Sequence, residues 1–152
     1  MWKTINCILL ISCVVASCRQ KARSERDEIS YWKASFVDSS FRLLYKEKDT
    51  ALALRYFDAA YQKEGQTAVY PSAVRFDLLA NFHYFFTGNN KATADMIDSA
   101  LALYSTPNLQ NHYPRTYVGL LLFGGNIAYR LSQYGKANDY YFRAKELADA
   151  YL

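Results

Sequence analysis

Apolar residues recur three or four positions apart along six stretches of the chain. This spacing places them on one face of a helix, whereas alternation would indicate a strand. The pattern predicts helices over 30–47, 49–60, 72–86, 90–103, 114–131 and 135–144. The sequence therefore predicts an all-α protein.

Prolines, glycines and short links divide the predicted helices into pairs. Pro71 and Pro114 stand where helices would start, because proline is tolerated in the first turn. Gly65 and Gly88 follow predicted helix ends, where a positive φ is favourable. The links at 48–49 and 88–89 are so short that they join only antiparallel neighbours. We therefore expect three antiparallel helix pairs.

The second helix of each predicted pair carries the same spaced set of side chains. A small, a large and a small residue follow one another at spacings of four and three. A small residue at each end lets a neighbouring helix approach, and the large residue fills the gap between them. The three sets are Ala53, Phe57, Ala60; Thr93, Ile97, Ala100; and Ala137, Tyr141, Ala144.

This arrangement resembles the tetratricopeptide repeat, a helix–turn–helix unit of about 34 residues. In the third copy, Gly125 falls on the family's first-helix glycine and Tyr134 on its turn tyrosine. Leu121 stands where tryptophan is usual and Ser132 where glycine is usual, and the copies are spaced 40 and 44 residues apart (Ala60, Ala100, Ala144). The resemblance implies a tetratricopeptide-like α-solenoid over 30–152. A plain antiparallel helical bundle is the alternative.

The first residues resemble a bacterial lipoprotein signal. Lys3 is followed by an uncharged stretch over 4–17, and Val15-Ala16-Ser17-Cys18 resembles the lipobox. The resemblance implies cleavage after residue 17, diacylation of Cys18, and a polar tether over 18–29. It places the protein in the cell envelope, anchored to a membrane and facing the periplasm. An ordinary signal peptide, an uncleaved anchor and a buried helix are alternatives.

The sequence offers no recognisable catalytic or metal-binding motif. His83 and His112 are the only histidines and are far apart, so we expect no metal site and no cofactor. We interpret His83 as a core or helix-face residue, and Asp95 and Asp98 as solvated helix carboxylates. A net charge of +4, spread along the chain, does not argue for nucleic acid. The protein is predicted not to be an enzyme.

In the tetratricopeptide family, ligands lie in a concave groove lined by the first helix of each pair. The corresponding positions here are basic and aromatic, which suits an extended peptide with acidic and apolar groups. Alternatively, the aromatic side chains pack between helices and the charges only solubilise the surface. The candidate groove residues are Arg42, Tyr45, Lys46, Arg75, Phe82, Asn126, Tyr129 and Arg130, with Leu78, Phe85 and Leu122 beside them.

Two functions follow from these resemblances. The first is a lipid-anchored, non-catalytic protein–protein interaction module at the bacterial envelope, with an acidic protein or peptide as its partner. The second rests on a likeness to the N-terminal sensory region of Bacteroidota tetratricopeptide regulators. On that interpretation, the chain is a truncated part of a membrane-bound transcriptional regulator or sensor kinase.

Overall fold

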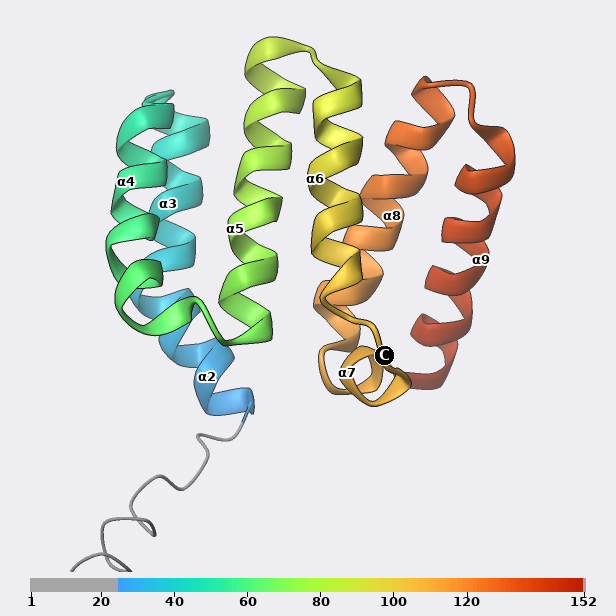
Figure 1. Cartoon of the computed structure of the whole chain (residues 1–152), viewed down its shortest axis with the longest axis horizontal. Helices are drawn as coiled ribbons and strands as arrows, with labels where there is room; N and C mark the ends of the chain where they lie inside the picture. Colours follow the sequence, from blue (N-terminus) through green and yellow to red (C-terminus); the bar gives the residue numbers. More distant parts are fainter. Residues whose placement is uncertain (1–24, 152) are drawn as a thin grey trace, which may run out of the picture.

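The computed structural model describes residues 25–151, and every regular element in this range is a helix (Figure 1). The all-α prediction is confirmed for the part of the chain described. The predicted signal over 1–17 and the candidate lipidation site Cys18 lie outside these residues.

The first helical rod is continuous from α2 (Glu25–Trp32) through η1 (Lys33–Val37) and α3 (Asp38–Arg42) to η2 (Leu43–Glu47). It begins earlier than predicted, so residues 25–29, which we assigned to the tether, are helical. The elements that follow are α4 (Thr50–Ala60), η3 (Tyr61–Gly65), α5 (Val69–Phe82), η4 (His83–Thr87), α6 (Asn90–Ala102), α7 (Pro107–His112), α8 (Pro114–Arg130) and α9 (Tyr134–Tyr151).

Short turns with capping side chains separate several of the helices. The side chains of Asp49 and Asn89 accept hydrogen bonds from backbone N–H groups in the first turns of α4 and α6, at 2.8 and 3.0 Å. The predicted positive φ of Gly88 is confirmed at 65°. Lys48 and Ser132 adopt φ values of 55° and 60°, a conformation that glycine would accept at lower cost.

Gly65 is required for space rather than for backbone conformation. We expected a positive φ there, and this was wrong, since Gly88 is the one glycine of the described chain with that conformation. A Cβ atom at residue 65 would lie 2.7 Å from Tyr61, 3.0 Å from Trp32 and 3.2 Å from Pro71. The glycine therefore lets η3 press against α2 and α5.

The short helix α7 was not predicted, because the expected helices leave residues 104–113 unassigned. Local residues nevertheless mark its start. Thr106 Oγ1 accepts a hydrogen bond from the Leu109 N–H at 3.3 Å, and Pro107 occupies the first helical position. Pro107 therefore starts a new helix after α6 has ended.

The repeated small–large–small sets face the core. Ala53, Phe57 and Ala60 are buried, as are Thr93, Ile97 and Ala100. Ala137 and Ala144 are also buried, and Tyr141 is half-buried. The packing face that the spacing predicted is therefore the one that the helices use.

Contacts at one end of the molecule tie the first helix to the segment before α8. Tyr113 Oη donates a hydrogen bond to Glu28 Oε2 at 2.9 Å, and His112 pairs with Glu25. The ring of Tyr113 also stacks on Tyr70 of α5, with 6.1 Å between centroids. We call these contacts the base latch, because they join residues 85 positions apart.

Candidate functional site: a groove between three helices

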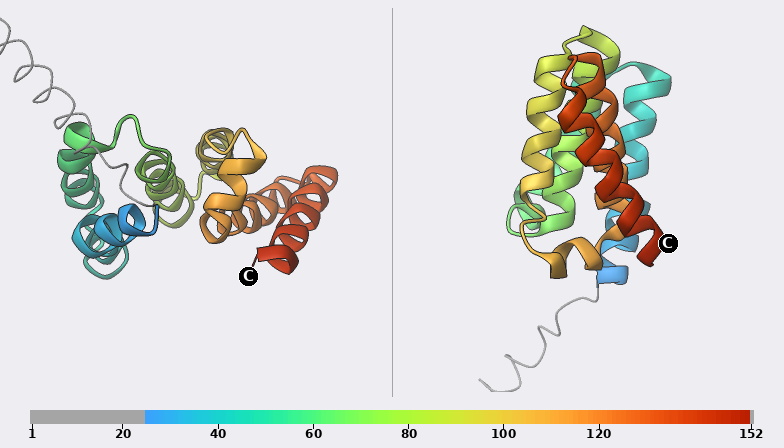
Figure 2. Two further views of the ribbon diagram at one scale, coloured as in Figure 1. Left: turned by 90° about the horizontal axis from the view of Figure 1, so that it is seen from below. Right: turned by 90° about the vertical axis from the view of Figure 1, so that its right-hand side faces the viewer.

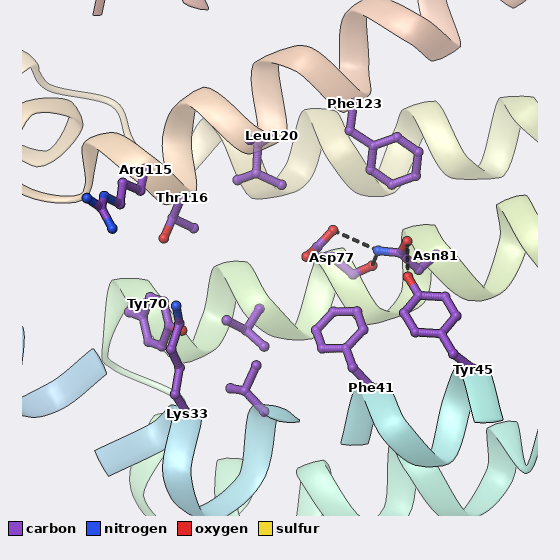
Figure 3. A pocket seen from close by; sticks show the side chains of 13 residues that line it. Lys33, Phe41, Tyr45, Tyr70, Asp77, Asn81, Arg115, Thr116, Leu120 and Phe123 are labelled. Carbon is purple, nitrogen blue, oxygen red and sulfur yellow. Dashed lines mark hydrogen bonds between the residues drawn. The ribbon is translucent and has the colours of Figure 1, made fainter. Parts of the chain in front are cut away.

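A pocket of about 480 Å³ lies between the first helical rod, α5 and α8 (Figure 3). We call it the central groove. Figure 2 shows the ribbons of these helices from two further directions. A Cβ atom at Gly119 of α8 would meet no atom within 4 Å, so the groove is open beside this residue. The lining residues are Lys33, Val37, Phe41, Tyr45, Tyr70, Val74, Asp77, Asn81, Arg115, Thr116, Gly119, Leu120 and Phe123.

Two cations stand at one end of the central groove. The side chains of Lys33 and Arg115 are exposed, and neither has an ion-pair or hydrogen-bond partner among the described residues. Figure 3 shows them near Thr116, on opposite walls. With Thr116 they also line a second pocket of about 530 Å³ towards α2 and His112, so the hollow continues past this basic end.

A hydrogen-bonded carboxylate stands at the other end. Asn81 Nδ2 donates to Asp77 Oδ1 at 2.9 Å and to the Asp77 carbonyl oxygen at 2.8 Å. Tyr45 Oη donates to Asn81 Oδ1 at 2.5 Å, which fixes the orientation of the amide (Figure 3). The three side chains link the first rod to α5 and form an acidic end.

Burial raises the pKa values of two side chains at the acidic end. The low polarity around Asp77 raises the pKa of its carboxyl to about 6, and the hydrogen bond from Asn81 only partly offsets this. Burial, together with the negative charge of Asp77, raises the pKa of the Tyr45 hydroxyl to about 12. Tyr45 therefore stays protonated and keeps donating to Asn81 at neutral pH.

The candidate residues of the first rod and of α5 lie in several different places. Tyr45 lines the central groove. Arg42 pairs with Glu47 on the surface, and Lys46 is exposed outside the groove. Arg75 was assigned to the groove, but its guanidinium donates to Asp58 of α4 at 2.8 Å and does not line the pocket.

Phe82 is also absent from the groove wall. Its ring stacks on Phe86, with 6.3 Å between centroids, and contacts His83. Phe82 is also partly buried against the main hydrophobic core, in agreement with the packing alternative. His83 is half-buried, and its Nδ1 atom is buried without a hydrogen-bond partner in the described chain.

The candidates on α8 lie together beyond the central groove. Asn126, Tyr129 and Arg130 line a separate pocket of about 340 Å³ with Tyr84. The Arg130 guanidinium stands over the Tyr84 ring at 5.2 Å. Asn126 Oδ1 accepts a hydrogen bond from Tyr141 Oη at 2.8 Å, so this amide is already engaged.

Sequence reasoning missed the residues at both ends of the central groove. Lys33, Asp77, Asn81 and Arg115 were not among the candidates. Asn81 and Asp77 stand one helical turn apart, and this polar pair inside an apolar helix was the signal available. Asp98, which we expected to be a solvated carboxylate, is partly exposed and also accepts hydrogen bonds from Lys136 and Tyr140 of α9 at 2.6 and 2.7 Å.

No family model matches the chain, and no curated protein or solved structure is significantly similar to it. Within residues 25–151, no group of three or more His, Cys, Asp or Glu side chains is placed to hold a metal ion. The helices in this range also include none that is long and apolar enough to span a membrane. The site is therefore interpreted from its own geometry.

Proposed function

We propose that this protein is a lipid-anchored, non-catalytic interaction module at the bacterial envelope, and that it binds a segment of a partner protein in the central groove. The observation that carries the proposal is a pair of cations, Lys33 and Arg115, which have no partner within residues 25–151 and lie at the end of a groove walled by aromatic and aliphatic side chains.

The wall chemistry favours a peptide segment with acidic and apolar groups. Lysine and arginine pair with carboxylates, and an arginine binds both oxygens at once. Phe41, Tyr45 and Phe123 supply rigid contact area that costs little conformational entropy on binding. The lining residues come from the first rod, α5 and α8, so an extended segment in the groove would contact all three.

The proposal treats the fold as tetratricopeptide-like, with three antiparallel helix pairs stacked on one another. The short links at 48–49 and 88–89 and the buried small–large–small sets support this. In such a stack, the first helices of successive pairs form the concave face. The central groove is lined by the helices that this assignment makes first, which are the first rod, α5 and α8.

The anchor would keep the groove close to a membrane. Six residues separate Cys18 from the start of α2 at Glu25. A fully extended chain spans at most about 3.5 Å per residue, so the tether would reach roughly 25 Å. Diacylated Cys18 would hold the protein stably, and the partner is then another envelope protein.

A photo-crosslinking experiment in the native organism tests the groove. A photoreactive phenylalanine at position 123 should crosslink one partner. The crosslink should be lost with Lys33→Glu combined with Arg115→Glu, because the charge at the basic end is reversed. The matched control is Arg55→Glu with Lys63→Glu, which changes the net charge equally at exposed positions of α4 and η3. Equal crosslinking in both double variants would overturn the proposal.

The anchor has its own test. Cys18→Ala should abolish labelling of the protein with a radioactive fatty acid and should leave an unprocessed precursor, because both acylation and cleavage depend on this cysteine in lipoproteins. Cys13→Ala is the control, since it lies within the predicted signal and should be labelled normally. Normal labelling and processing of the Cys18→Ala protein would rule out the lipobox.

A further inference from the structure

We propose that the acidic end of the central groove is a subsite for a lysine side chain of the partner segment. This inference rests on the proposed function, and it adds a second charge to the ligand. The segment would place a carboxylate on Lys33 and Arg115 and an ammonium group on Asp77, with apolar contacts between them.

The Asp77 carboxylate has room for a cation and lacks one. No lysine, arginine or histidine among the described residues pairs with it. Its hydrogen-bond donor is a neutral amide, Asn81 Nδ2, which engages Oδ1. Oδ2 has no hydrogen-bond donor in the described chain, and Asp77 is one of the residues that line the pocket. A buried carboxylate without an opposite charge is costly to keep.

The surroundings of this carboxylate also favour a cation. Figure 3 shows the rings of Phe41, Tyr45 and Phe123 around the end of the groove where Asp77 lies. Aromatic faces attract ammonium and guanidinium groups through the ring quadrupole. Tyr45 cannot add a negative charge of its own at neutral pH, because its hydroxyl stays protonated and donates to Asn81.

Because only one oxygen of the Asp77 carboxylate lacks a donor in the described chain, the subsite suits an ammonium group better than a guanidinium. Arginine gains most when its planar fork meets both oxygens of a carboxylate. Here the Asn81 amide donates to Oδ1 at 2.9 Å, which leaves Oδ2 as the oxygen without a donor in the described chain. Lysine carries a compact charge on a flexible stem and needs only one strong acceptor. Its four methylenes would lie along Val74 and Leu120.

The test compares two small probes on the full chain. Nα-acetyl-lysine amide carries the ammonium group, and Nα-acetyl-norleucine amide has a similar chain without the charge. NMR titration should follow the side-chain amide of Asn81 and the ring of Phe123. The lysine probe should bind about tenfold more tightly than the norleucine probe, as expected for a charge-assisted contact.

Two variants decide whether Asp77 is the cause. Asp77→Asn should bring the two probes to equal affinity, because it removes the charge while keeping an acceptor for Asn81. Asp95→Asn is the matched control, since Asp95 is an exposed carboxylate on α6 that pairs with Lys91 outside the groove, and it should keep the tenfold preference.

Each result supports or overturns the inference. A preference that persists in Asp77→Asn, or that is absent from the original protein up to roughly 0.1 M probe, would overturn the lysine subsite. The crosslink from position 123 and its dependence on Lys33 and Arg115 would still stand in that case. In contrast, the proposed function itself would be overturned if the original protein gave no crosslink from position 123, or if both double variants crosslinked equally.

Discussion

Two faces of α8 show opposite uses of glycine. On the packed face, a Cβ atom at Gly124 would lie 2.8 Å from the Tyr140 ring, and one at Gly125 would lie 2.5 Å from the Tyr141 ring. On the groove face, a Cβ atom at Gly119 would meet nothing within 4 Å. One helix therefore combines a face specified by tight packing with a face that is open to the central groove.

The strongest way to break the packed face is to place a charge in it. Ala137 of α9 is buried, with 1% of its surface exposed. Ala137→Arg should lower the free energy of unfolding by about 4 kcal/mol, because it overfills a close helix contact and buries a cation without a partner. Urea denaturation followed by circular dichroism measures this change. The control is Asn138→Arg at the exposed neighbouring position, and an equal loss there would contradict the assigned helix face.

A single methyl group should also disturb the packed face. Gly125→Ala forces the Tyr141 ring to move, and Tyr141 also donates a hydrogen bond to Asn126. We expect a loss of about 2 kcal/mol in the free energy of unfolding, a typical cost of overpacking. The measurement is the urea midpoint, compared with that of Gly135→Ala, where a Cβ atom would meet no neighbour. An unchanged midpoint would mean that the Tyr141 ring moves aside without a cost in stability.

On the opposite wall of the groove, Asp77 of α5 should lower the free energy of unfolding by an amount that depends on pH. The pKa of Asp77 is raised from 3.8 to about 6 in the folded protein, so the folded state holds its proton more tightly than the unfolded state does. As pH rises from 4 to 6, the unfolded chain releases this proton first, and the folded state loses stability relative to it.

Asp77→Asn removes this titration. The variant should be more stable than the original protein by on the order of 2 kcal/mol at pH 7, and the difference should shrink towards pH 4. Urea unfolding at a series of pH values measures it. A difference that is constant across this range would show that Asp77 titrates normally.

The smallest expected effect sharpens the comparison between the two faces. Gly119→Ala should raise the free energy of unfolding by about 0.5–1 kcal/mol, because alanine favours a helix and its methyl group would meet open space. The same change therefore has opposite signs at positions 119 and 125 of one helix. Thermal unfolding gives the sign directly, and a destabilised Gly119→Ala protein would mean that the groove wall is packed.

The helices and their packing faces could be predicted because they depend on local spacing. Ala53, Phe57 and Ala60 carry the pattern in the sequence itself, and they are buried as expected. The extent of the groove was harder to predict. Helix α5 buries residues on more than one side, including Ala73, Val74 and Leu78, so its apolar pattern does not single out one face.

The orientation of α5 explains why two of its candidates lie outside the central groove. With no clear face, the family-based register placed Arg75 and Phe82 in the groove, whereas Asp77 and Asn81 line it. On α8, the candidates Asn126, Tyr129 and Arg130 line a separate pocket, and residues 115–123 lie along the central groove. Contacts between distant helices decide which side of a helix lines a pocket, and the apolar pattern of one helix does not reveal them.

The base latch has a consequence for how the molecule unfolds. In a linear stack of repeats each unit contacts only its neighbours, so the terminal units can open while the rest persists. Here Glu28 is held by Tyr113 across 85 positions of the chain, and His112 pairs with Glu25 beside it. Fraying of the first helix would therefore break contacts with the segment that precedes α8. We expect this coupling to make the described chain unfold more cooperatively than a stack in which each repeat contacts only the next.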